Sequence, residues 1–164
     1  MGKKIKVAIM MGSKSDLDTV LETIKVLKEL NVSHEVKVLS AHRTPKDVVL
    51  YVEQLSKSGT QVIIAAAGMS AALAGTVAAH TILPVIGIPI ETKTLRGLDS
   101  LLSTVQMPKG IPVACMSIGK HGAQNAAIFA CQILALQDDK LLKKMLKFKE
   151  KMAKEIRKIK ICQT

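Results

Sequence analysis

Short runs of branched apolar residues alternate along this chain with longer segments that have the apolar spacing of amphipathic helices. Several of the short runs are apolar on both faces, which is typical of strands buried in a parallel sheet. Such an alternation predicts a doubly wound α/β domain. We expect strands at 5–11, 34–39, 61–67, 84–90 and 112–118. We expect helices between them at 16–30, 45–58, 70–81, 98–105 and 123–136.

Five parallel strands favour the flavodoxin-like strand order 2-1-3-4-5, with right-handed crossovers and helices on both faces. The 164 residues fit one domain, because no linker, repeat or change of composition divides them. Residues 137–164 follow the fifth strand–helix unit, and their periodic apolar positions predict a basic amphipathic C-terminal helix. The sequence therefore predicts a three-layer sandwich spanning residues 1–164, with an extra helix at its end.

The charge of the chain is concentrated in that C-terminal segment. The formal net charge is +11, and residues 138–164 contain ten Lys or Arg against four Asp or Glu. A basic surface can bind nucleic acid or an acidic membrane. We instead interpret it as the solvated face of a helix whose apolar face needs a partner, on its own domain or on a neighbouring subunit. Two Phe, one Tyr and no Trp argue against modules that stack bases on aromatic rings.

The cysteines indicate the cellular setting. Cys115, Cys131 and Cys162 are scattered and odd in number, and they have neither metal-ligand spacing nor a disulfide framework. We therefore expect a cytoplasmic protein without a bound metal. The N-terminus does not resemble a signal peptide, and glycines and prolines break the apolar segment 61–90 into pieces too short to cross a membrane. We expect no membrane and no nucleic-acid partner.

Ligands of doubly wound sheets bind beyond the carboxyl ends of the strands, near the point where the strand order reverses. This rule selects the loops 12–16, 40–45, 67–71, 91–97 and 119–122. In the first loop, Gly12 allows close backbone approach, and the amides and hydroxyls of Ser13 and Ser15 can hold an anion at a helix start. Asp16 could accept hydrogen bonds from ribose hydroxyls. The alternative that Ser15 or Asp16 only caps the helix stays open.

The second loop reads Ser40-Ala41-His42-Arg43-Thr44-Pro45. His42 can transfer protons near neutral pH. Arg43 can bind a phosphate or a carboxylate through two parallel hydrogen bonds. The third loop, from Ala65 to Gly75, consists almost entirely of small residues, which allow a backbone to approach a flat ligand.

The other histidines are weaker candidates. His34 begins a predicted strand and His80 ends a predicted helix, so both are expected to have structural roles. His121 lies on the predicted loop 119–122 and is a minor ligand candidate.

Several ordered motifs together resemble the PurE family of purine biosynthesis. They are 7–16 (VAIMMGSKSD), 40–45 (SAHRTP), 84–89 (PVIGIP), 97–103 (GLDSLLS), 105–113 (VQMPKGIPV) and 125–127 (NAA). The resemblance covers about residues 5–137. It implies an N5-carboxyaminoimidazole ribonucleotide mutase, which moves a carboxylate from N5 to C4 of an aminoimidazole ribonucleotide without a cofactor. It also implies a homo-octamer and a functional link to an ATP-dependent synthetase of the N5-carboxylated substrate.

Carried over by position, the resemblance implies that His42 is the proton-transfer residue. It places Ser13 and Arg43 near the phosphate and Asp16 near the ribose. It implies that the loop Gly68–Gly75 closes on the imidazole and the moving carboxylate. The further substrate-binding positions are Gly12, Ser15, Ser40, Ala41, Gly68, Ser70 and Leu73.

The third loop departs from many bacterial mutases, which have a second His and a Leu-Pro pair where this chain has Ala72-Leu73-Ala74. Ser70 and Leu73 resemble the related branch that carboxylates aminoimidazole ribonucleotide directly with CO2. That branch usually has Lys at the position of Arg43 and lacks the 105–113 motif, so the mutase is favoured. An alternative of a different class is a nucleotide-sensing or interaction module, which would bind nucleotide without turnover.

Overall fold

The computed structural model describes residues 4–159 and is built around one parallel sheet. The strand order is β2-β1-β3-β4-β5, and every neighbouring pair is parallel. The strands are β1 (Val7–Met11), β2 (His34–Val38), β3 (Val62–Ala67), β4 (Val85–Pro89) and β5 (Ala114–Cys115). The predicted α/β fold class and strand order are confirmed.

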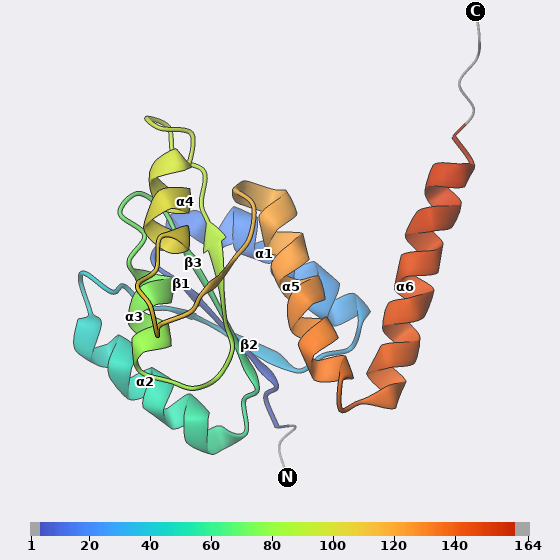
Figure 1. The fold of residues 1–164 in the computed structure, drawn as a ribbon, viewed down its shortest axis with the longest axis horizontal. Coiled ribbons are helices and arrows are strands. Elements are labelled where there is room, and N and C mark those ends of the chain that lie inside the picture. The colour runs from blue at the N-terminus through green and yellow to red at the C-terminus, as the bar shows by residue number, and fades with distance from the viewer. Residues whose placement is uncertain (1–3, 160–164) are drawn as a thin grey trace, which may run out of the picture.

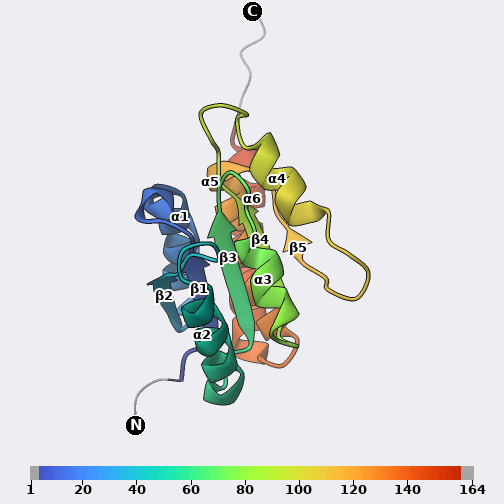
Figure 2. The ribbon, with the colours of Figure 1, turned by 90° about the vertical axis from the view of Figure 1, so that its left-hand side faces the viewer.

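Helices cover both faces of the sheet (Figures 1 and 2). They are the 3-10 turn η1 (Lys14–Asp16) and the helices α1 (Leu17–Glu29), α2 (Pro45–Ser58), α3 (Leu73–Ala79), α4 (Leu98–Val105), α5 (Gly119–Ala135) and α6 (Asp139–Arg157). One core packs α1, α5 and the start of α6 against the sheet, and the other packs α2 and α3 against the opposite face. In β1, Val7 and Ile9 belong to the first core, whereas Ala8 and Met10 belong to the second. This burial on both faces explains why the strand is apolar without alternation.

Local signals set the bounds of helices α2 and α4. Pro45 occupies the first turn of α2, where its missing N–H costs nothing, and Gly59 follows the helix with φ of 85°. Gly97 has φ of 86° and turns the chain directly into α4. Both helices therefore have the bounds that the sequence predicts.

Most elements agree with the prediction to within two residues, and three differ more. Strand β5 is shorter than 112–118, because it lies at the edge of the sheet and pairs with β4 through Ala114 and Cys115. Helix α3 begins at Leu73 rather than at residue 70. Helix α5 begins at Gly119, so residues 119–122 form its first turn and not a loop. A side chain at Gly122 would overlap the carbonyl oxygen of Ser117, so only glycine fits this tight helix start.

Helix α6 lies within the predicted C-terminal segment, of which residues 160–164 with Cys162 fall outside the described part. Figure 1 shows α6 beside α5 at its start and running past the body of the domain toward the C-terminus. Leu141 and Met145 are buried in the first core, and Phe148 packs against it. Leu146, which lies between Met145 and Phe148 in the sequence, is exposed, and so are Met152 and Ile156 farther along. The start of α6 is therefore anchored to its own domain, whereas Leu146, Met152 and Ile156 form an apolar stripe without a partner within residues 4–159. None of the helices in residues 4–159 has both the length and the apolarity that a membrane span requires.

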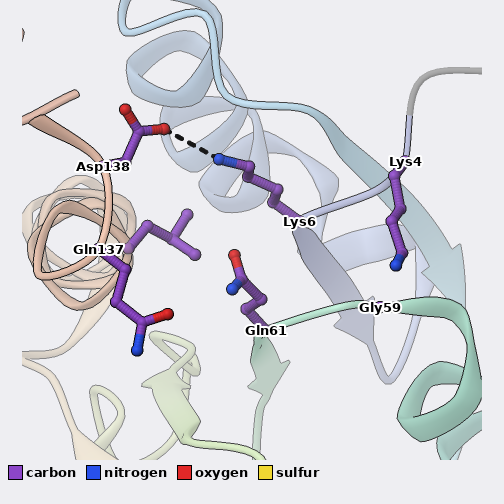
Figure 3. Close-up of a pocket in the computed structure, with 7 residues that line it drawn as sticks. Lys4, Lys6, Gly59, Gln61, Gln137 and Asp138 are labelled. Atoms are coloured by element: carbon purple, nitrogen blue, oxygen red, sulfur yellow. Dashed lines mark hydrogen bonds and ion pairs between the residues drawn. The ribbon is translucent and has the colours of Figure 1, made fainter. Parts of the chain in front are cut away.

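Two polar contacts fasten the start of α6. Lys6, just before β1, forms an ion pair of 3.0 Å with Asp138, whose carboxylate also accepts a hydrogen bond from the Leu141 amide. Lys144 donates to the Leu30 carbonyl oxygen after α1. Figure 3 shows Lys6 and Asp138 pointing toward one another across a small pocket of about 250 Å³. This pocket lies at the amino end of β1, so it is at the opposite edge of the sheet from the loops predicted to bind a ligand.

Candidate functional site

A pocket of about 970 Å³ lies at the carboxyl edge of the sheet. It is bordered by the loops that follow β1, β2, β3 and β4, as the rule for doubly wound sheets predicts. All the predicted catalytic and substrate-binding positions line it, namely Gly12, Ser13, Ser15, Asp16, Ser40, Ala41, His42, Arg43, Gly68, Ser70 and Leu73. The fold thus brings together four loops that are far apart in the sequence.

The loop after β1 is organised by a reciprocal cap. The Ser15 amide donates to the Ser13 hydroxyl, while the Ser13 amide donates to the Asp16 carboxylate over 3.1 Å. Ser13 thus caps the 3-10 turn η1, while Asp16 occupies the N-cap position of α1, as expected, although its side chain makes no capping hydrogen bond to α1. The Asp16 side chain completes the cap from the third position.

Asp16 is buried, with 7% of its surface exposed. Burial raises the pKa of its carboxyl, whereas hydrogen bonds from Ser15 and Ser13 and the charge of Arg43 act in the opposite direction. The capping role does not use all the acceptor capacity of this carboxylate, because each oxygen has more than one lone pair. Asp16 can therefore cap the helix and still accept a hydroxyl from a ligand.

The loop after β2 carries His42 and Arg43, both exposed at the pocket. The Arg43 guanidinium donates to the Gly12 carbonyl oxygen over 2.7 Å and to the Ser40 hydroxyl over 3.2 Å. The Ser40 hydroxyl also accepts from the Arg43 amide. Arg43 is therefore oriented from both sides and places a fixed positive charge beside the first loop.

The loop after β3 forms the third wall of the pocket. Met69 has a left-handed backbone, with φ of 59°, and two tight turns follow, from the Ala71 amide to Met69 and from the Ala72 amide to Ser70. These turns delay the start of α3 to Leu73, whose side chain is buried. The wall facing the pocket therefore consists of small residues and one large exposed side chain, Met69.

The sequence model of the AIR carboxylase family matches residues 6–155, which include all four of these loops. The chain belongs to the AIR carboxylase family. Its resemblance to PurE is thereby confirmed.

Individual members of the AIR carboxylase family are similar to this chain over nearly its whole length. A Haemophilus influenzae protein named N5-carboxyaminoimidazole ribonucleotide mutase is 49% identical over 150 residues, which are 92% of each chain. A Bacillus subtilis protein of the same name is 53% identical over 139 residues, or 85% of this chain and 86% of its own. The crystal structure of Treponema denticola PurE superposes with a TM-score of 0.84 at 28% identity, covering 92% of both chains.

The AIR carboxylase pocket has a fourth wall whose residues the sequence analysis did not single out. It comes from the loop after β4 and includes Glu91, Thr92 and Lys93, together with Asp99 of α4. The Thr92 hydroxyl donates to the Asp99 carboxylate over 2.9 Å and accepts a hydrogen bond from the Gly97 amide. The loop was predicted from its place after a strand, but Asp99 lies inside a helix and reaches the pocket only because Gly97 turns the chain back.

The remaining histidines of this AIR carboxylase family member lie outside the pocket. His121 is exposed in the first turn of α5 and does not line the pocket, so its prediction as a rim-loop ligand was wrong. His34 bonds through Nδ1 to the Val32 carbonyl oxygen, and His80 ends α3. Within residues 4–159, no three His, Cys, Asp or Glu side chains are grouped as metal ligands would be.

Proposed function

We propose that this protein interconverts N5-carboxyaminoimidazole ribonucleotide and 4-carboxy-5-aminoimidazole ribonucleotide in purine biosynthesis. The observation that carries the proposal is one pocket in which His42 stands beside Arg43, Ser13 and Asp16. These groups supply a proton carrier, an anion-binding cation and acceptors for ribose hydroxyls. Identity of about half to curated mutases over most of the chain supports the same reaction.

The substrate would lie across the loops in a defined order. Its phosphate binds at Ser13 and Arg43, where helix-start amides and a guanidinium favour an anion. Its ribose binds at Asp16, and its imidazole lies against the loop Gly68–Gly75. Gly12, Ser15, Ser40 and Ala41 complete the phosphate and ribose contacts. In this arrangement His42, next to Arg43, is available to transfer protons at the aminoimidazole end of the substrate, where the carboxylate moves.

The reaction would proceed through enclosed CO2. The N–C bond of the carbamate breaks, CO2 is released into the pocket, and protonated His42 gives N5 its proton. C4 then bonds to the CO2 carbon, and neutral His42 removes the C4 proton, which restores the aromatic ring. No cofactor takes part in these steps. Holding the two reactants together can lower the barrier by roughly 7–11 kcal/mol.

The proposal also covers the oligomeric state of the protein and its location in the cell. We assign a homo-oligomer, an octamer by family resemblance, because the exposed stripe of Leu146, Met152 and Ile156 on α6 needs a partner surface. A neighbouring copy of the chain supplies that surface. We place the enzyme in the cytoplasm, where an ATP-dependent synthetase would supply the N5-carboxylated substrate.

The test is an assay of both carboxylated ribonucleotides with purified protein, without ATP and with free CO2 scavenged. We expect rapid interconversion. Formation of the C4-carboxylated product only from aminoimidazole ribonucleotide and added CO2 would identify the direct carboxylase instead. Nucleotide binding without turnover would indicate the sensing module.

A further inference from the structure

Met69 has an unfavourable backbone conformation at the edge of the pocket. Its φ of 59° lies in the left-handed region, which glycine and asparagine adopt more readily than other residues. Asn31 has a φ of 57° at the end of α1, where the residue type suits the turn. Methionine, unlike asparagine, has no preference for the left-handed region, so the backbone at Met69 is strained. Strained backbones of this kind concentrate at ligand sites.

The side chain of Met69 is also unusually exposed for a methionine. Methionine is among the residues most often buried, yet Met69 is 70% exposed and lines the pocket. Its neighbours in the loop, Gly68, Ser70 and Ala72, are small, and Leu73 is buried in the core below. Both Met69 and Leu73 line the pocket, but Met69 is the large apolar side chain of this loop that is exposed to a ligand.

The backbone around Met69 is held by hydrogen bonds, while its side chain is exposed and unconfined by packing. The Met69 and Ser70 carbonyl oxygens accept hydrogen bonds of 2.9 and 2.7 Å from the amides of Ala71 and Ala72. Methionine is unbranched and has a polarisable thioether, so it adapts to flat rings by rotating about its side-chain bonds. Met69 can thus close over a bound heterocycle without a rearrangement of the loop.

We propose that Met69 is a positioning residue that covers the imidazole of the bound ribonucleotide and retains CO2 in the pocket. This inference rests on the proposed mutase function. While CO2 is retained, its carbon bonds to C4, and the C4 proton passes to His42. If CO2 escapes, C4 keeps its hydrogen, N5 keeps the proton from His42, and aminoimidazole ribonucleotide leaves as the product.

The experiment measures how N5-carboxyaminoimidazole ribonucleotide is partitioned between these two products. Met69→Gly and Met69→Asn both suit the left-handed backbone but remove the apolar cover, and Met69→Leu keeps apolar bulk. We expect the fraction released as aminoimidazole ribonucleotide, relative to carboxylated product, to rise at least roughly tenfold in the first two variants. Met69→Leu should remain close to wild type. Asn31→Gly places glycine at a left-handed position outside the pocket and should leave the ratio unchanged.

The outcomes separate this inference from the function on which it rests. Absence of interconversion by the wild-type protein would overturn the mutase and leave nothing for Met69 to retain. If the wild type interconverts the substrates while Met69→Gly or Met69→Asn keeps the wild-type ratio, the role of Met69 is refuted. A Met69→Leu variant as leaky as Met69→Asn would also refute it, because apolar bulk would then not matter.

Discussion

The guanidinium of Arg43 donates a 2.7 Å hydrogen bond to the carbonyl oxygen of Gly12, which joins the loop after β2 to the loop after β1. The contact is possible because β1 and β2 are adjacent and end together, with Met11 opposite Val38. The Ser40 hydroxyl accepts the Nε–H of the same guanidinium. Two of its five N–H groups are therefore used in orienting it, and the other three remain for an anion.

Replacing Arg43 should weaken substrate binding more than it slows chemistry. In Arg43→Lys the charge remains, but the planar pair of donors and the bond to Gly12 are lost. We expect KM to rise about 10-fold to 100-fold, equivalent to roughly 1.4–2.8 kcal/mol, with a smaller change in kcat. Ser40→Ala, which removes a single orienting acceptor, should have a smaller effect on KM. Steady-state kinetics of both variants provide the measurement, and an unchanged KM in Arg43→Lys would argue against phosphate binding there.

His42→Asn should abolish turnover while leaving nucleotide binding intact. Asparagine fills a similar space and is polar, but it cannot carry a proton near neutral pH. We expect kcat to fall by about 10²-fold to 10⁴-fold. Calorimetric titration with aminoimidazole ribonucleotide should give an affinity close to that of the wild type. Full activity in this variant would remove His42 from the mechanism.

Asp16 should make the protein more stable when its carboxyl is protonated. Burial raises its folded-state pKa above the ordinary value of 3.8. The stabilising contribution is therefore complete below that value and is lost as the pH rises through the raised pKa. Asp16→Asn is uncharged at every pH, so it should gain stability relative to the wild type as the pH rises. Urea unfolding of both proteins at a series of pH values checks this, and a difference that does not vary with pH would contradict it.

Asp138, at the start of α6, should have the opposite effect of pH on stability from Asp16. A hydrogen bond from the Leu141 amide and the neighbouring Lys6 lower the pKa of Asp138 below its ordinary value of 3.8. Its contribution to stability is present above that value and is lost as the pH falls through the lowered pKa.

Asp138→Ala removes both the cap and the ion pair, whereas Asp138→Asn keeps an acceptor for the Leu141 amide. We expect a lower melting temperature at neutral pH in both variants, with the larger decrease in Asp138→Ala. Equal decreases would mean that the cap contributes little. Thermal unfolding followed by circular dichroism provides the measurement.

The sequence predicted the architecture well because its signals are local. Pro45 and Gly59 mark the bounds of α2, and strands buried on both faces need uninterrupted apolar runs. The same reasoning failed where tertiary geometry decides. Residues 119–122 contain two glycines and were predicted as a loop, but the close approach of Gly122 to Ser117 allows a helix to begin there.

The residues of the site were likewise predictable where local position decides and not where tertiary geometry decides. Residues at strand ends, such as Ser13 and His42, could be selected because the carboxyl ends of parallel strands share one edge. Asp99 could not be selected in this way, since it lies in a helix and its bond to Thr92 depends on the turn at Gly97. The exposure of Met69 also depends on turns that leave no clear mark in the sequence.

The position of β1 inside the sheet has a consequence for how the chain acquires its structure. Val7 of β1 lies opposite Val62 of β3, so the first strand obtains its inner neighbour only after more than fifty further residues have been made. Until then, the apolar strand Val7–Met11 has one edge open and is a potential site of association between nascent chains. Pairing over such sequence distances is slow. Synthesis through the end of β3 at Ala67 is therefore the earliest point at which the centre of this sheet can close.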